Sequence, residues 1–153
     1  MRDRKARAWT RSPRSAAVVA ALALAAAAST GCGDKKSVTG PSAPPDPTAT
    51  FSRVQREVFT PSCALSGCHA GPSPILGLSL EAGRSYGNLV GVPAVQSSRL
   101  RVAPGLPEDS FLVSKITADG GIVGNRMPLG GPALPSDLQH LVIDWVRRGA
   151  PND

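Results

Sequence analysis

Aromatic side chains are scarce in this chain of 153 residues. Phe, Trp and Tyr together make up 4% of the sequence, whereas glycine occurs 16 times and proline 15 times. A small domain that is rich in loops and poor in large apolar side chains has difficulty closing a sizeable core unaided. The composition therefore favours a domain that gains apolar bulk from a bound group.

Several enzyme signatures are also missing. The chain has only two histidines, and we find no Ser/His/Asp set, no glycine-rich phosphate loop and no pair of carboxylates with a matching base. The net charge of +6 comes almost entirely from residues 1–31, which hold six basic residues and one acid. The other 122 residues hold 11 Lys or Arg and 10 Asp or Glu. We therefore expect no nucleic-acid partner, because the folded part has no excess of positive charge.

Long apolar runs are absent as well, and the clearest one covers residues 16–28. Thirteen residues are too few for a membrane-spanning helix, which needs about 20. A basic segment precedes this run and Ser29-Thr30-Gly31 follows it, so we predict a signal peptide at 1–31. The following Cys32 makes this site resemble the cleavage box of bacterial lipoproteins, which implies that Cys32 carries lipid. An ordinary signal peptide, with Cys32 left as a free thiol, is the alternative.

The next segment, 32–50, is polar and contains Pro41, Pro44, Pro45 and Pro47. Closely spaced prolines prevent regular helix and favour extended, solvated backbone. We therefore predict that 32–50 is a tether and that 51–153 is the folded domain.

Residues 63–69 read Cys-Ala-Leu-Ser-Gly-Cys-His. Cys63 and Cys68 are spaced so that each thiol can add to one vinyl group of a porphyrin, and His69 can then reach its iron. The usual attachment motif is C-x-x-C-H, and here four residues separate the cysteines. Gly67 suits the outward bulge that a longer spacer needs. A Cys63–Cys68 disulfide and a zinc site remain the alternatives.

The cysteine count favours haem among these readings. One lipidated Cys32 and two thioethers at Cys63 and Cys68 account for all three cysteines, whereas a disulfide leaves His69 without a purpose. A four-ligand zinc site would need every remaining soft donor, including His140. We place His140 on the solvated side of a helix, away from its apolar stripe.

Helical patterns flank this motif. We expect a helix at 51–59 that ends at Thr60-Pro61, and short helices at 79–89, capped by Ser79, and at 108–116. A last helix should begin with Ser136 as its N-cap, form a capping box with Gln139, and stop at Gly149. Its apolar positions follow helical spacing: Leu138, Leu141, Val142, Trp145 and Val146.

Met127 is the only methionine after residue 1 and stands in the run Arg-Met-Pro-Leu-Gly-Gly-Pro at 126–132. Pro128 favours extended backbone at Met127. A thioether is a common second axial ligand of haem iron, and a core-filling role is the alternative.

The order of these features resembles the class I cytochromes c: a helix, a thiol pair with His, an irregular middle, a Met-Pro loop and a closing helix. The resemblance covers 51–153 and is greatest for the small C-x4-C-H cytochrome c-like lipoproteins of bacterial envelopes. It implies a small all-α domain with long loops around one covalent haem c. It also implies a hydrogen bond from the His69 ring to the carbonyl of Pro72 or Pro74, and packing of the last helix across the first.

The resemblance implies an electron carrier rather than an enzyme. Cys63 and Cys68 would anchor the haem, and His69 and Met127 would be its axial ligands. The protein would be exported to the periplasm or outer envelope, held there by lipid, and would exchange electrons with redox partner proteins. If Met127 does not bind iron, a gas sensor or peroxidase-like site is the second hypothesis. A structural lipoprotein with a disulfide or zinc at 63–69 is the third.

Overall fold

A computed structural model describes residues 43–119 and 122–153. These residues belong to one compact unit of the chain. The predicted signal peptide at 1–31 and the lipidation site Cys32 lie outside the described residues. Within the described part, no helix is long and apolar enough to span a membrane.

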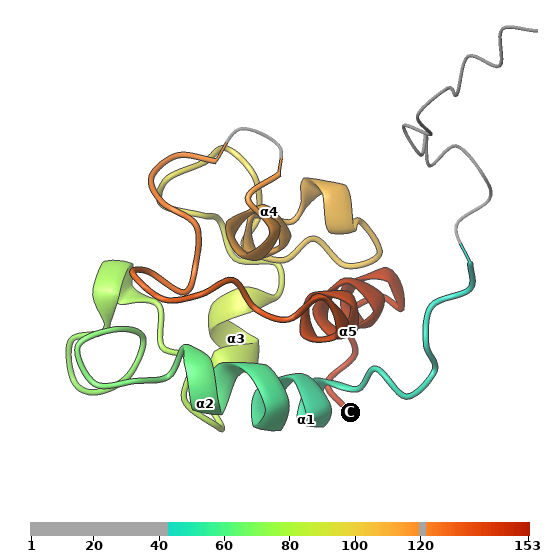
Figure 1. The fold of residues 1–153 in the computed structure, drawn as a ribbon, viewed down its shortest axis with the longest axis horizontal. Helices are drawn as coiled ribbons and strands as arrows, with labels where there is room; N and C mark the ends of the chain where they lie inside the picture. The colour runs from blue at the N-terminus through green and yellow to red at the C-terminus, as the bar shows by residue number, and fades with distance from the viewer. Residues whose placement is uncertain (1–42, 120–121) are drawn as a thin grey trace, which may run out of the picture. The chain divides into compact units, whose positions relative to one another are not determined.

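The unit is helical, as predicted, and its described residues form no β-strand (Figure 1). A few isolated bridges, such as the one between Val90 and Val102, hold the irregular middle of the chain together. The α-helices are α1 (Phe51–Val54), α2 (Thr60–Ser62), α3 (Ser85–Leu89), α4 (Phe111–Thr117) and α5 (Ser136–Arg147). Short 3₁₀ turns occur at Ile75–Gly77 and Pro107–Asp109.

The first helix is longer than the sequence predicts. A π-helical turn, Gln55–Phe59, joins α1 to α2 without a break, and the N–H of Thr60 donates to the carbonyl of Gln55. The expected stop at Thr60-Pro61 is wrong, because the helix continues to Ser62. Pro61 lies near the end of this continuous helical run and, because proline has no N–H, donates no helical hydrogen bond there.

The last helix, α5, has the predicted extent but not the predicted cap. Ser136 is already helical, Pro135 occupies the N-cap position, and no side chain caps the helix. Gln139 is not free for a capping box, because its Nε2 donates to the carbonyl of Leu134 at 2.8 Å. At the other end Gly149 has φ +95°, as expected of a residue that ends a helix.

The two middle helices begin later than predicted. Helix α3 starts at Ser85, because Gly83 has φ +80° and interrupts the helical run. Ser79 caps no helix, and its Oγ instead exchanges hydrogen bonds with Glu81. Helix α4 starts at Phe111, after the 3₁₀ turn that takes up the acidic residues expected in its first turn.

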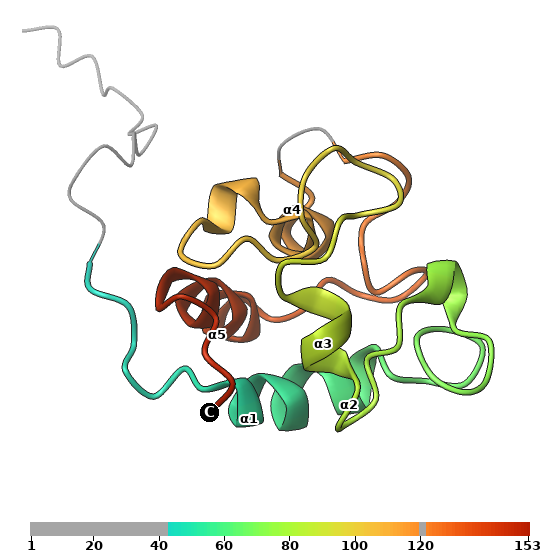
Figure 2. The ribbon, with the colours of Figure 1, turned by 180° about the vertical axis from the view of Figure 1, so that it is seen from behind.

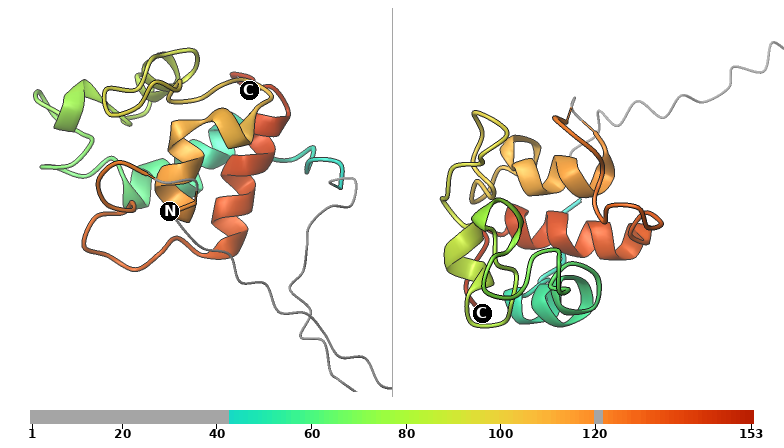
Figure 3. Two further views of the ribbon diagram at one scale, coloured as in Figure 1. Left: turned by 90° about the horizontal axis from the view of Figure 1, so that it is seen from above. Right: turned by 90° about the vertical axis from the view of Figure 1, so that its left-hand side faces the viewer.

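Helices α1 and α5 pack against each other, as expected, and α4 contacts the other side of α5 (Figures 2 and 3). The ring of Phe51 lies 5.4 Å from that of Trp145, 5.1 Å from Tyr86 and 6.4 Å from Phe59, centroid to centroid. Four of the few aromatic side chains are thus concentrated at one interface.

The helical unit also includes residues just before α1. Ala49 is fully buried, and Nη1 of Arg148 donates to its carbonyl at 2.6 Å. The N–H of Asp46 reaches Oδ2 of Asp144 at 3.3 Å. Residues that the sequence assigns to the tether are therefore attached to the domain at its α5 side.

Candidate functional site

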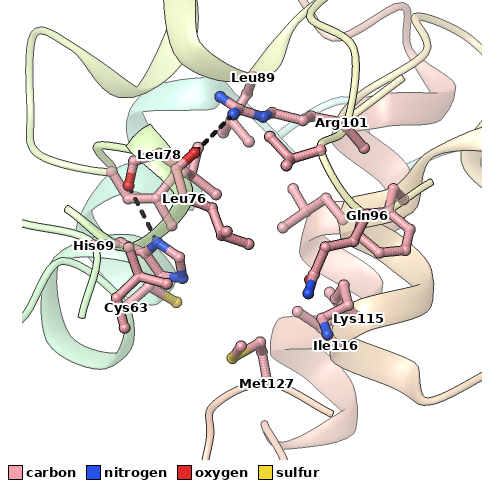
Figure 4. Close-up of a pocket in the computed structure, with 16 residues that line it drawn as sticks. Cys63, His69, Leu76, Leu78, Leu89, Gln96, Arg101, Lys115, Ile116 and Met127 are labelled. Carbon is pink, nitrogen blue, oxygen red and sulfur yellow. Dashed lines mark hydrogen bonds between the residues drawn. The ribbon is translucent and has the colours of Figure 1, made fainter. Parts of the chain in front are cut away.

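A cavity of about 100 Å³ opens between the loop after α2, the irregular middle of the chain and helix α4 (Figure 4). Most of its lining is apolar: Cys63, Ile75, Leu76, Leu78, Leu80, Leu89, Ala94, Val95, Phe111, Leu112, Ile116 and Met127. The polar side chains that line it are His69, Gln96, Arg101 and Lys115.

His69 is half-buried and one of its ring nitrogens is already committed. Nδ1 lies 3.1 Å from the carbonyl oxygen of Leu78. A carbonyl can only accept, so Nδ1 carries the proton and donates. In the neutral ring this leaves the lone pair on Nε2, and Figure 4 shows that nitrogen on the side of the ring facing the cavity.

The predicted proline partner of His69 is wrong. The acceptor is the carbonyl of Leu78 rather than that of Pro72 or Pro74. A 3₁₀ turn at Ile75–Gly77 directs the chain back toward the histidine and places Leu78 there. Leu76 has φ 54° within this turn, a left-handed conformation that is unusual for leucine. A second hydrogen bond, from the N–H of Leu80 to the carbonyl of His69 at 2.8 Å, holds the segment after this turn beside the histidine.

The surroundings keep His69 neutral. Burial is the main cause that lowers its pKa, and the positive charges of Arg101 and Lys115 lower it further. The hydrogen bond to Leu78 opposes these effects but does not reverse them. A neutral imidazole with a fixed tautomer and a free Nε2 is the form that binds a metal ion.

The two cysteines of the motif occupy different environments. Cys63 lines the cavity and is half-buried, and burial raises the pKa of its thiol to about 11, with a smaller contribution from Cys68. Cys68 is exposed and is not among the residues that line the cavity. Both are free thiols rather than a disulfide.

Met127 lies at the cavity, across the open space from His69 (Figure 4). Its N–H donates to the carbonyl of Lys115 at 2.7 Å, which attaches the loop to α4. Arg126 holds the same loop by donating to the carbonyls of Gly131 at 2.9 Å and Pro132 at 3.3 Å. Two segments 58 positions apart, at 69 and 127, thus meet at one cavity.

The structure therefore brings three of the four predicted haem residues to one cavity: Cys63, His69 and Met127. The fourth, Cys68, precedes His69 directly but faces outward. His140 is exposed on α5 and does not line the cavity, in agreement with the prediction. In residues 43–119 and 122–153, no group of three or more His, Cys, Asp or Glu side chains is placed to hold a metal ion.

Sequence reasoning missed the polar side chains on the far side of the cavity. Arg101 and Lys115 stand in segments that read as irregular chain and short helix, with no motif around them. Phe111 and Ile116 at helical spacing do indicate the inward face of α4, and that signal also places Lys115 beside them. The acceptor for His69 could not be found this way, because any backbone carbonyl can serve.

Comparisons with known proteins give no further guide. No family model matches the chain, and none of the curated proteins or solved structures searched matches it significantly.

Proposed function

We propose that residues 51–153 form a class I-like, single-haem cytochrome c domain that carries electrons at a bacterial cell envelope. The observation that carries the proposal is the meeting of His69 and Met127 at one apolar cavity, with Cys63 beside them. An imidazole and a thioether are the axial ligand pair of many cytochromes c. Two independent sequence features, the motif at 63–69 and Met127, share this cavity, although nothing in their local sequence requires them to meet.

The residues present fit such a group in their chemistry. Nε2 of His69 has its lone pair free, and the bond from Nδ1 to Leu78 holds the ring in place. The lining is mostly apolar, as a porphyrin requires, and Cys63 lines the same space. Cys68 fits less directly, since a second thioether requires its exposed side chain to turn toward the cavity.

Under this proposal each residue has a distinct task. Cys63 and Cys68 anchor the haem, and His69 and Met127 bind its iron. The iron supplies one-electron oxidation and reduction. Because His69 and Met127 would both bind the iron, no coordination site would be left for a substrate, so the proposal includes no enzymatic turnover. Cys32, after a cleaved leader, would carry the lipid that retains the protein at the membrane, where redox partner proteins reach it.

The test is expression in a bacterial host that is competent in cytochrome c maturation. We expect a coloured protein whose mass exceeds that of the polypeptide by one haem. Cys63→Ser should abolish or halve covalent haem, and so should Cys68→Ser. Cys32→Ser is the matched control, because it removes a thiol outside the motif and should leave the haem content unchanged while abolishing labelling with a radioactive fatty acid.

A second measurement tests the axial ligands. The ferric protein should show the weak absorption band near the red edge of the visible spectrum that accompanies a Met–iron bond. Met127→Ala should remove this band, and Leu129→Ala, an exposed neighbour in the same loop, should retain it. A coloured protein without the band would favour a five-coordinate sensor or peroxidase-like site. A colourless protein would refute the proposal and leave a structural lipoprotein.

A further inference from the structure

The cavity carries positive charge without any acid to balance it. Among the residues that line it are Arg101 and Lys115, and no Asp or Glu is present in that set. Within the described part of the chain, neither cation forms an ion pair with a carboxylate. An apolar cavity with two cations and no acid is electrostatically suited to an anionic ligand.

Both cations are held in place by neutral groups. Nη1 of Arg101 donates to the carbonyl of Asn88 at 2.8 Å, and Nη2 lies 3.4 Å from that of Leu76. Nζ of Lys115 donates to the carbonyl of Val123 at 3.2 Å and lies 5.7 Å from the ring centroid of Phe111. These contacts orient each side chain and leave donors unused on both, since an ammonium has three and a guanidinium five.

Burial makes this arrangement costly for the protein alone. Lys115 is only 8% exposed, and burial lowers the pKa of both Lys115 and Arg101. A desolvated cation that meets only carbonyl oxygens is less stable than one paired with an anion. Some other arginines of the described chain pair with acids, for example Arg84 with Glu81 at 3.6 Å, whereas Arg99 and Arg126 bond only to neutral groups. What distinguishes Arg101 and Lys115 is that both line the same apolar cavity.

We infer that Arg101 and Lys115 bind the acidic groups of the ligand that fills the cavity. The ligand class is a flat or elongated apolar molecule with at least one ionised carboxylate at its edge. Figure 4 shows Lys115 across the open space from His69 and the guanidinium of Arg101 at the upper edge of that space, beside Leu89, so the apolar body would lie between Lys115 and the histidine with Arg101 at its edge. In naming a porphyrin dicarboxylate as this molecule, the inference rests on the proposed function.

Two porphyrins that differ only in their acids test the inference. The full chain, purified in its colourless form, is titrated with iron protoporphyrin IX and with the dimethyl ester of the same compound, and both dissociation constants are measured by absorbance. We expect the free acid to bind more tightly by at least a hundredfold, because esterification removes two hydrogen bonds between charged partners and each is worth a factor of about ten or more. Equal affinity for the two compounds would overturn the inference.

Variants then assign the preference to the two side chains. Arg101→Gln and Lys115→Gln should each reduce the acid-over-ester preference by roughly tenfold, and the double variant should remove it. Arg101→Lys retains the charge and should retain most of the preference. The matched control is Arg84→Gln, at an exposed position outside the cavity, which should bind both porphyrins as the unchanged chain does. If the double variant still prefers the acid, the assignment is wrong.

The ester comparison separates this inference from the proposed function. A chain that discriminates acid from ester but never carries covalent haem supports the cation assignment and refutes the cytochrome. A haem-loaded chain whose colourless form binds both porphyrins equally supports the cytochrome and refutes the cation assignment. Circular dichroism of every variant shows whether it is folded, and Lys115→Gln carries the test if Arg101→Gln does not fold.

Discussion

The two motif thiols should differ sharply in reactivity, because the fold buries only one of them. Two single-thiol chains make the comparison direct: one keeps Cys63 and the other Cys68, with the remaining cysteines replaced by serine. Both are prepared without haem and treated with iodoacetamide at pH 8, folded and in 6 M guanidinium chloride (a concentration of about this order unfolds most domains). Mass spectrometry follows the modified fraction over time.

The expected magnitude follows from the pKa of Cys63, which burial raises from 9.0 to about 11. At pH 8 this lowers the thiolate fraction about a hundredfold relative to the unfolded chain. A thiolate of higher pKa is also more nucleophilic, and with a Brønsted coefficient of about 0.4–0.5 this restores a factor of roughly 6–10. The net result is an alkylation rate about 10- to 20-fold lower in the folded chain, before any steric protection.

The pH dependence provides an independent check. In the unfolded chain the rate at Cys63 should level off above about pH 9, whereas in the folded chain it should keep rising toward pH 11. The Cys68 chain serves as the control, because that side chain is exposed and should react at similar rates folded and unfolded. Equal rates for folded and unfolded Cys63 would refute the burial of its thiol and weaken its assignment to the cavity.

Three further predictions concern the packing around α1 and α5, each measured by urea unfolding of the haem-free chain. Trp145→Ala should lower the free energy of unfolding by about 3–5 kcal/mol, since the side chain is fully buried; a loss below 1 kcal/mol would contradict the aromatic core. Asp153→Ala should cost about 1 kcal/mol, because Oδ1 accepts the N–H of Phe51 at the start of α1, and an unchanged midpoint would show that this cap does not form. Ser85→Ala should cost about 1–3 kcal/mol by leaving Gln55 without its buried hydroxyl partner, whereas Ser52→Thr, at an exposed position, should change little.

Helical periodicity in the sequence correctly predicts which side chains of the first and last helices are buried. Phe51, Val54, Val58 and Phe59 were predicted to form one apolar stripe, and all four are buried. The same holds for the stripe of α5 from Leu141 to Val146. Such stripes can be predicted because every side chain on one face of a helix meets the same neighbour. The ends of the helices are less predictable from the pattern of apolar residues. The positive φ of Gly83 delays the start of α3, and the side chain of Gln139 donates to the carbonyl of Leu134, and the pattern reveals neither.

The structure shows where the few aromatic side chains lie. Phe51, Phe59, Tyr86 and Trp145 are gathered into one cluster, while the prediction that a bound group adds apolar bulk stays a prediction. Their concentration closes the interface of α1 with α5 and leaves the space beside α4 to apolar aliphatic side chains and Phe111. A total count cannot reveal this division, because it does not say where the rings lie.

The sequence by itself determined the helical class, the thiol–imidazole motif with Cys63, Cys68 and His69, and Met127 as the one methionine available to join it. These depend on residue type and local spacing. Only the tertiary structure decided that Met127 reaches the cavity of His69, that Leu78 holds the histidine ring, and that Lys115 and Arg101 face the same space without an acid. The reason is that each of these contacts joins segments many residues apart or uses a backbone carbonyl, which every residue possesses. Only the folding of the whole chain brings such groups together.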